Sequence, residues 1–354
     1  MSGNSVGKIF QVTTFGESHG VAMGAVIDGV LANIPLTAQD VQKELDRRRP
    51  GQSAVTTQRR EKDRVMILSG IMNGKTTGTP IGLLIYNEDA NPKDYLALKD
   101  IFRPGHADFV YQQKYGIRDW RGGGRSSGRE TAMRVAAGAI AKKILARENM
   151  SIVGYVKEIA GIKADKIDLK VIEKNAVRAP DLVAARKMIT KIERVRQQGD
   201  SVGGIIEVVV NGCPVGLGEP VFDKLNAQLA ASVMSIGAVK GVEFGAGFAA
   251  KDMLGSEFND VVCFKNKKLI ARTNHNGGIS AGISNGQQLV MRAVIRPTCS
   301  IAKQQTALTR DLKTQKITIA GRHDPCICPR AVVVVEAMVA ITLADALLVA
   351  RSRS

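Results

Sequence analysis

Two histidines and one aspartate lie in glycine- or proline-containing corners, where a proton-transferring side chain would be accessible to a ligand. His19 follows Gly-Glu-Ser, His106 follows Arg-Pro-Gly, and Asp324 precedes a proline. Histidine is the side chain best suited to proton transfer near neutral pH. A lone histidine is more often structural, and an acid before a helix also acts as a cap. Two loop histidines with arginines nearby favour a functional site.

The densest group of anion-binding residue types is at residues 121–131, Arg-Gly-Gly-Gly-Arg-Ser-Ser-Gly-Arg-Glu-Thr. Ser127 and Glu130 have the spacing of a capping box, so we expect a helix to start here with its amides facing the glycines. The alternative is a surface turn with solvated arginines. Because three arginines in one turn repel one another unless an anion is present, the loop predicts a phosphate or carboxylate site. It has neither Walker A nor dinucleotide-binding spacing.

The charge balance also predicts negatively charged partners. Fifty Lys and Arg against 33 Asp and Glu give a formal charge of +17. A nucleic-acid-binding module is the alternative from another class, but only 4% of residues are aromatic and the sequence has no helix-turn-helix, RRM or zinc-finger pattern. A phosphatase or nucleotide hydrolase is a second alternative, which lacks clustered acids for a metal pair. We therefore expect a small-molecule ligand and no nucleic acid.

The cysteines number five and are scattered, at positions 213, 263, 299, 326 and 328. An odd, scattered set without a signal peptide predicts a reducing, cytoplasmic location. Cys326 and Cys328 are too close for the usual zinc pair, so we expect no metal.

The elements that must position these residues alternate irregularly between strands and helices. Periodicity predicts strands at 9–15, 21–27, 65–71, 81–86, 152–159 and 203–210, helices at 37–48, 181–198 and 222–236, and a polar flap at about 251–276. The apolar stretch 331–350 contains two acids, which favours a buried helix over a membrane span. We expect a single domain over residues 1–354 with mixed α/β layers and no membrane role.

Five ordered segments closely resemble the chorismate synthase family. They are Gly16–Gly20 running to Asp28-Gly29, Asp46–Gly51, Arg103–Asp108, Gly122–Arg134, and Gly321–Cys326 running to Glu336–Met338. The resemblance covers residues 16–338. It implies an α+β fold, a β-α-β sandwich with helices enclosed between mainly antiparallel sheets, and a homotetramer.

The resemblance also implies a reaction. A chorismate synthase is a carbon–oxygen lyase of aromatic amino acid biosynthesis, in the shikimate pathway. It removes phosphate and a ring proton from 5-enolpyruvylshikimate 3-phosphate by 1,4-anti elimination, giving chorismate. The family needs reduced FMN (FMNH2), which supplies electron density transiently without net redox change. The two carboxylates and phosphate of the substrate, with the phosphate of FMN, would account for many arginines beside glycine loops.

Residue roles follow from the resemblance. His106 would keep the flavin protonated and reduced, His19 would donate a proton to the departing phosphate, and Asp324 would assist deprotonation at the flavin N5. The implied substrate-binding residues are Ser18, Arg48, Arg103, Arg129 and Arg322. The implied FMN contacts are Arg125, Ser126, Ser127, Gly237, Ala238, Ala281, Arg296, Pro297, Thr298, Cys299, Ser300 and Arg322.

The sequence departs from the family pattern at a few positions. Ala54 stands where a second arginine usually follows Arg48, so one anion contact is missing or comes from elsewhere, with Arg59 and Arg60 as candidates. Arg48 is the implied NADP contact, and the sequence leaves open whether NADPH or an external reductase reduces the flavin. Three further departures are Arg296 for lysine, Ala281 for glycine and Gly128 for alanine.

Overall fold

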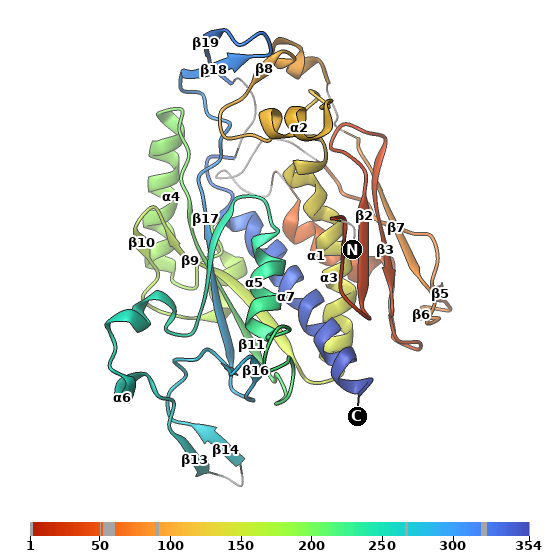
Figure 1. Ribbon diagram of the computed structural model, residues 1–354, viewed down its shortest axis with the longest axis vertical. Helices are drawn as coiled ribbons and strands as arrows, with labels where there is room; N and C mark the ends of the chain where they lie inside the picture. Colours follow the sequence, from red (N-terminus) through yellow and green to blue (C-terminus); the bar gives the residue numbers. More distant parts are fainter. Residues whose placement is uncertain are drawn as a thin grey trace.

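The computed structural model describes residues 3–49, 51, 61–88, 92–265, 268–319 and 324–353. Two five-stranded sheets lie on either side of a layer of helices (Figure 1). Neighbouring strands run antiparallel in both sheets. The predicted α+β fold, with helices enclosed between antiparallel sheets, is therefore confirmed.

The first sheet carries the His19 corner. Its order is β1 (Ser5–Val6), β2 (Gln11–Phe15), β3 (Ala22–Asp28), β7 (Ile81–Tyr86) and β4 (Met66–Ile67). Alternate residues of β7 are buried, as expected for a strand with one face on the core. The strand predicted at 65–71 is wrong in extent: β4 ends at 67, and β5 (Ile71–Met72) pairs instead with β6 (Lys75–Thr76) in a separate hairpin.

The second sheet supports the other side of the helical layer. Its order is β10 (Ile162–Lys163), β9 (Ser151–Ile159), β11 (Gly204–Asn211), β17 (Leu289–Ile295) and β12 (Val239–Phe244). Ile206, Val208 and Val210 of β11 are completely buried, so this face of the sheet packs on the helices.

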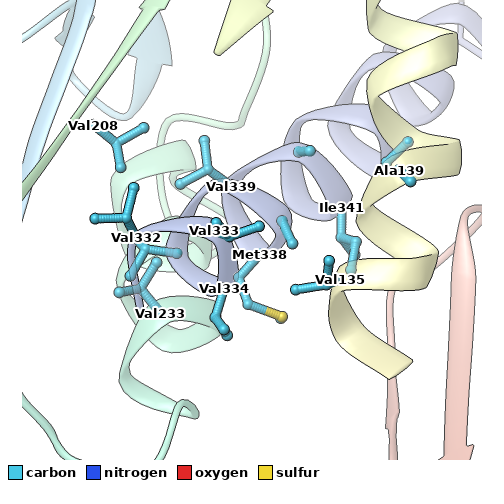
Figure 2. Packing of buried hydrophobic residues seen from close by; sticks show 14 of the residues in the cluster. Val135, Ala139, Val208, Val233, Val332, Val333, Val334, Met338, Val339 and Ile341 are labelled. Carbon is cyan, nitrogen blue, oxygen red and sulfur yellow. The ribbon is translucent and has the colours of Figure 1, made fainter. Parts of the chain in front are cut away.

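Helix α7 (Cys328–Arg351) is the centre of the core. It packs against α3 (Thr131–Ala146), α5 (Leu225–Met234), β9 and β11. Figure 2 shows Val332 and Val339 facing Val208 of the sheet, while Ile341 lies toward Val135 of α3. By length and composition α7 is a candidate membrane span, but 94% of its most apolar window is buried inside the protein. It is a core helix, as predicted for 331–350.

One buried acid ties α7 to three other elements. The carboxylate of Glu336 lies 2.7 Å from Arg47 Nη1 of α1 (Ala38–Arg48) and 2.7 Å from Lys142 Nζ of α3. It also accepts from the amide of Gly154 in β9 at 2.8 Å. Burial alone would raise the pKa of Glu336, but Lys142 and Arg47 lower it to about 2. The acid stays ionised and fixes the position of α1 relative to α7.

The remaining elements lie around this core. They are α2 (Asp108–Tyr115), α4 (Leu182–Gln197), α6 (Gly255–Phe258), β8 (Ile101–Phe102), β13 (Val262–Lys265), β14 (Lys268–Ala271), β15 (Ile279–Ser280), β16 (Ile283–Ser284), β18 (Gln305–Thr309), β19 (Thr314–Ile317), and the 3-10 turns η1 (Pro92–Leu98), η2 (Gly124–Ser126), η3 (Gly128–Glu130), η4 (Leu169–Lys174) and η5 (Gly247–Asp252). The predicted flap at 251–276 contains α6 and the β13–β14 hairpin, which projects from the body (Figure 1).

The glycine-rich loop at residues 121–131 leads into α3 through two 3-10 turns rather than directly. Ser127 accepts from the amide of Arg129, as a cap does, but Glu130 pairs with Arg134 at 2.9 Å. The predicted capping box is therefore wrong. A competing ion pair with the next turn takes the glutamate that would have reached back.

Candidate active site

The His19 corner, residues 16–20, packs directly on the glycine-rich loop at residues 121–131. His19 is 8% exposed, and its Nδ1 lies 3.1 Å from Ser18 Oγ. Gly122 covers the ring: a Cβ at this glycine would lie 2.6 Å from His19 Nδ1, and its φ of 79° also disfavours any larger residue. The rings of His19 and Tyr95 make an edge-to-face contact with a centroid distance of 5.1 Å. The imidazole is thus held in one orientation.

Arg103 joins the same loop to the start of α2. Its Nε and Nη2 donate to the two oxygens of Asp108 at 2.7 and 2.8 Å, and Nη2 also donates to the carbonyl of Gly122 at 2.7 Å. Burial alone would raise the pKa of Asp108, but the hydrogen bonds and charges of Arg103 and Arg118 lower it. A bidentate pair of this kind fixes the plane of the guanidinium.

His106 is held between two segments distant in sequence. Its Nδ1 lies 3.0 Å from the carbonyl oxygen of Pro104, and its Nε2 lies 2.9 Å from Ser300 Oγ. The adjacent Cys299 thiol donates to the carbonyl of Gly105 at 2.9 Å. The segment 296–300 therefore runs alongside the His106 corner.

Asp324 lies at the far end of that segment. Its backbone carbonyl accepts from Thr298 Oγ1 at 3.0 Å, and its carboxylate accepts from Arg330 Nη1 at 2.6 Å. Arg330 Nε also donates to the carbonyl of Arg48 at 3.2 Å. Arg330 thus connects the candidate acid–base residue to the candidate substrate-binding arginine.

Arg48 and Arg129 share one carboxylate. Asp63 accepts from Arg48 Nη2 at 2.9 Å with one oxygen and from Arg129 Nη1 with the other. Arg48 Nη1 donates to Thr131 Oγ1 at 3.1 Å, and Arg129 Nε donates to Asn87 Oδ1 at 2.8 Å. Burial lowers the pKa of Arg48 to about 10, and the charge of Asp63 opposes this effect.

Asn87 closes the set of contacts. Its Nδ2 donates to the carbonyls of Glu17 and Gly20 at 3.0 and 2.8 Å, within the His19 corner. A continuous ring of contacts therefore passes through the segments 16–20, 103–108, 122–131, 296–300 and 324–330 and the end of α1. The ring brings together His19, His106 and Asp324, and with them Ser18, Arg48, Arg103 and Arg129.

A pocket of about 1190 Å³ opens beside this ring. Arg125 and Ser126 line it, together with Gly122, Gly124, Arg134 and Gly237. Arg125 Nη2 donates to the carbonyl of Thr14 at 2.9 Å, and Ser126 Oγ donates to that of Gly123 at 2.7 Å. The pocket exceeds the roughly 300–1,000 Å³ of ordinary small-molecule sites. Its volume, its glycine-rich wall and its arginines fit a flavin with a phosphate.

The other predicted cofactor residues divide into two places. The carbonyl of Ala238 accepts from the amide of Arg296 at 2.9 Å, and Arg296 Nη1 donates to the carbonyl of Pro297 at 2.9 Å, so 237–238 and 296–300 are adjacent. Ala281 lies in the β15–β16 turn, where Gly282 accepts from the first amide of α5 at 2.7 Å. Ala281 is not itself a lining residue of the pocket, although the pocket runs along α5 from Asp223, near this turn, to Gly237.

Some predicted residues lie outside the described part of the chain, namely Arg322, Ala54, Arg59 and Arg60. Among the described residues, no group of three His, Cys, Asp or Glu side chains has metal-binding geometry.

Sequence reasoning missed three residues of the ring: Asp63, Asn87 and Arg330. Asp63 had a weak signal, because it follows Glu61 at a spacing of two directly after a basic segment. Asn87 stands beside a strand end, and Arg330 opens the last helix; neither position is unusual for its residue type. Their importance comes only from their partners in three dimensions.

Comparisons with known proteins agree on one family. Residues 10–348 match the family model described as chorismate synthase. The chain is 53% identical over 350 residues to the chorismate synthase of Methanococcoides burtonii, covering 98% of this chain and 96% of that protein. It is 54% identical over 353 residues to that of Methanosarcina mazei (98% and 97% covered) and 51% identical over 349 residues to that of Chloroflexus aggregans (98% and 96%). A crystal structure of a chorismate synthase superposes with a TM-score of 0.78 at 32% identity, covering 97% of this chain and 93% of that one.

Proposed function

The chain belongs to the chorismate synthase family and is a carbon–oxygen lyase of aromatic biosynthesis, and from this premise we propose the reaction and the residues that carry it out. The substrate is 5-enolpyruvylshikimate 3-phosphate, which loses phosphate and a ring proton by 1,4-anti elimination to give chorismate in the shikimate pathway. Reduced FMN, when bound, supplies the electron density that helps the phosphate leave, without net redox change.

The observation that carries this proposal is the ring of contacts. It links proton-transferring side chains to arginines through contacts between residues as far as 282 positions apart, beside a pocket of about 1190 Å³. Structural stability alone does not require so many like-charged arginines at one place. A substrate with three anionic groups does.

His19 is proposed to donate a proton to the departing phosphate. Support comes from its burial and its contact with Ser18, and from Arg103, which reaches the same glycine loop at Gly122. An imidazole can donate a proton to a leaving phosphate, and a guanidinium held at the same loop can offset its negative charge. Ser18, Arg48, Arg103 and Arg129 are proposed to bind the substrate.

His106 and Asp324 are proposed to act on the cofactor side of the substrate. A carbonyl only accepts hydrogen bonds, so His106 Nδ1 carries a proton toward Pro104, and Nε2 exchanges its hydrogen bond with Ser300 according to its protonation state. Asp324, oriented by Arg330, would assist deprotonation at the flavin N5 when FMN is bound. Arg125, Ser126, Ser127, Gly237, Ala238 and the segment 296–300 are proposed to hold FMN.

Three further properties are proposed. A homotetramer is supported by exposed apolar side chains on the projecting β13–β14 arm, namely Val262, Phe264, Leu269 and Ile270. A single domain is supported by one hydrophobic cluster that includes residues of both large sheets. A cytoplasmic location is supported by the five free cysteines.

An anaerobic assay tests the function. Purified protein with chemically reduced FMN and 5-enolpyruvylshikimate 3-phosphate should release phosphate and chorismate in equal amounts. His106→Ala and Asp324→Ala should each lose roughly 100- to 10,000-fold in turnover while still binding substrate. His275→Ala and Asp311→Asn are matched controls, since His275 lies near α6 and Asp311 is exposed. Full activity in both test variants would remove the roles assigned to them.

A second pair of reactions addresses the reductant. Oxidised FMN is supplied with and without NADPH. Turnover that needs NADPH would show that the chain reduces its own flavin, whereas no turnover in either reaction would show that it depends on an external reductase.

A further inference from the structure

We propose that Asp63 is a positioning residue of this site: its carboxylate holds the guanidinium groups of Arg48 and Arg129 together, oriented for the anionic groups of the substrate. This inference rests on the proposed function, because it takes the two arginines as substrate-binding groups. Only a weak signal in the sequence marked Asp63, which lies in neither a helix nor a strand.

The geometry of Asp63 is that of a bridge. Its side chain is 0% exposed, and each carboxylate oxygen accepts from a different arginine, Oδ2 from Arg48 and Oδ1 from Arg129. The side chains of these arginines are 2% and 9% exposed. One carboxylate therefore sets the separation and the relative orientation of two buried guanidinium groups.

The backbone of Asp63 is also specialised for this position. Its φ is 46°, in the left-handed region that residues with a Cβ adopt infrequently. Such a conformation persists where surrounding contacts determine it. At Asp63, those contacts are the two buried arginine pairs.

The electrostatics explain why a carboxylate is needed. Burial lowers the pKa of Arg48, and the nearby charges of Arg330 and Arg129 lower it further. The charge of Asp63 acts in the opposite direction. Without it, two like charges would be buried side by side and would separate or take up water, and the anion-binding geometry would be lost.

The remaining contacts show what the bridge leaves for a ligand. Arg129 Nε donates to Asn87, and Nη2 pairs with Glu61 at 3.0 Å. Arg48 Nη1 donates to Thr131, but Nε is buried and has no hydrogen-bond partner within the described part of the chain. The Nε donor of Arg48, held in a fixed orientation, is suited to bind an oxyanion.

The test is the near-isosteric variant Asp63→Asn, assayed anaerobically with chemically reduced FMN. We expect the KM for 5-enolpyruvylshikimate 3-phosphate and the inhibition constant of inorganic phosphate to rise together, roughly 10- to 100-fold. The kcat should change by less than about threefold and FMN affinity should be unchanged, because the bridge acts on substrate binding. Asp311→Asn, which removes one exposed carboxylate paired with Lys313, is the matched control.

Asp63→Glu is the second variant, and it keeps the charge while moving it by one methylene. It should show an intermediate KM, and it carries the test if Asp63→Asn does not fold. An unchanged KM in either folded variant overturns the inference. So does a parallel loss of kcat, FMN affinity and thermal stability, which would mark Asp63 as merely structural.

Direct phosphate binding separates this inference from the function. If the wild-type protein does not release phosphate from the substrate, the proposed function fails. The inference then still depends on calorimetry with inorganic phosphate, where wild-type binding at least tenfold tighter than that of Asp63→Asn supports it and equal binding overturns it.

Discussion

The imidazole Nε2 of His106 lies 2.9 Å from the hydroxyl of Ser300, although 194 residues separate them in the chain. Because Nδ1 donates to the carbonyl of Pro104, the neutral ring presents a lone pair at Nε2, and Ser300 donates to it. When the ring is protonated, Nε2 donates to Ser300 instead. Ser300 can stabilise both states, as expected for the partner of a residue that transfers protons.

Replacing Ser300 by Ala should therefore slow proton transfer by His106 without disrupting the site. We expect kcat to fall about fivefold, the equivalent of one hydrogen bond of about 1 kcal/mol, while KM changes little. The pH dependence of kcat should also shift, because the hydrogen bond no longer balances the two states of His106. Ser300→Thr keeps the hydroxyl and should retain most activity. Equal kcat and an equal pH profile in Ser300→Ala and the wild type would contradict this role.

Arg330 should act through orientation rather than charge alone. Arg330→Lys keeps the charge but cannot contact both Asp324 and the carbonyl of Arg48, which a guanidinium reaches at 2.6 and 3.2 Å. We expect roughly 10- to 100-fold lower kcat/KM from stopped assays of chorismate formation. Arg310→Lys, at an exposed pair with Asp100, is the control. Equal activity in the two variants would speak against a positioning role for Arg330.

Substitution by alanine should reduce activity strongly at Gly122 and hardly at all at Gly128. A Cβ at Gly122 would lie 2.6 Å from His19 Nδ1 and 3.2 Å from Ser18 Oγ, on a backbone with φ of 79°. Gly122→Ala should thus lose at least tenfold in kcat through displacement of His19. Nothing lies within 4 Å of a Cβ at Gly128, so Gly128→Ala should stay within about twofold of wild type. Similar activities of the two variants would show that the contact with His19 is unimportant.

Glu336 should dominate the acid sensitivity of the fold. Its pKa is about 2 in the folded protein against 4.5 for an ordinary glutamate, so its stabilising contribution is complete above pH 4.5 and is lost as the pH falls toward 2. Glu336→Gln leaves Arg47 and Lys142 without their common partner and should destabilise by roughly 3–5 kcal/mol at neutral pH. Its unfolding free energy should also fall less steeply than that of the wild type between pH 4.5 and 2.

Urea unfolding at several pH values measures both effects. Glu257→Gln, which removes an exposed acid from α6, is the control and should follow the wild-type pH dependence. A parallel dependence in Glu336→Gln and the wild type would show that another group controls acid unfolding.

Local patterns in the sequence specified much of the fold. Apolar periodicity located α1, α4 and α7 to within a few residues, because one face of each of the first two, and nearly all of the third, is buried. Five ordered motifs identified the family, because residue types and their spacing can be read directly along the chain. The capping box at Ser127 and the strand at 65–71 failed because other local contacts, an i,i+4 salt bridge and a short hairpin, competed with the predicted ones.

The sequence by itself therefore determined which residues are chemically able to act, namely the histidines, the arginines and the acid before the last helix. Only the tertiary structure decided how they are held, through Asp63 between two arginines, Asn87 at the His19 corner and Arg330 between Asp324 and α1. The physical reason is range. A helix or a turn is stabilised by neighbours in sequence, whereas a buried ion pair depends on two side chains whose separation along the chain leaves no local pattern.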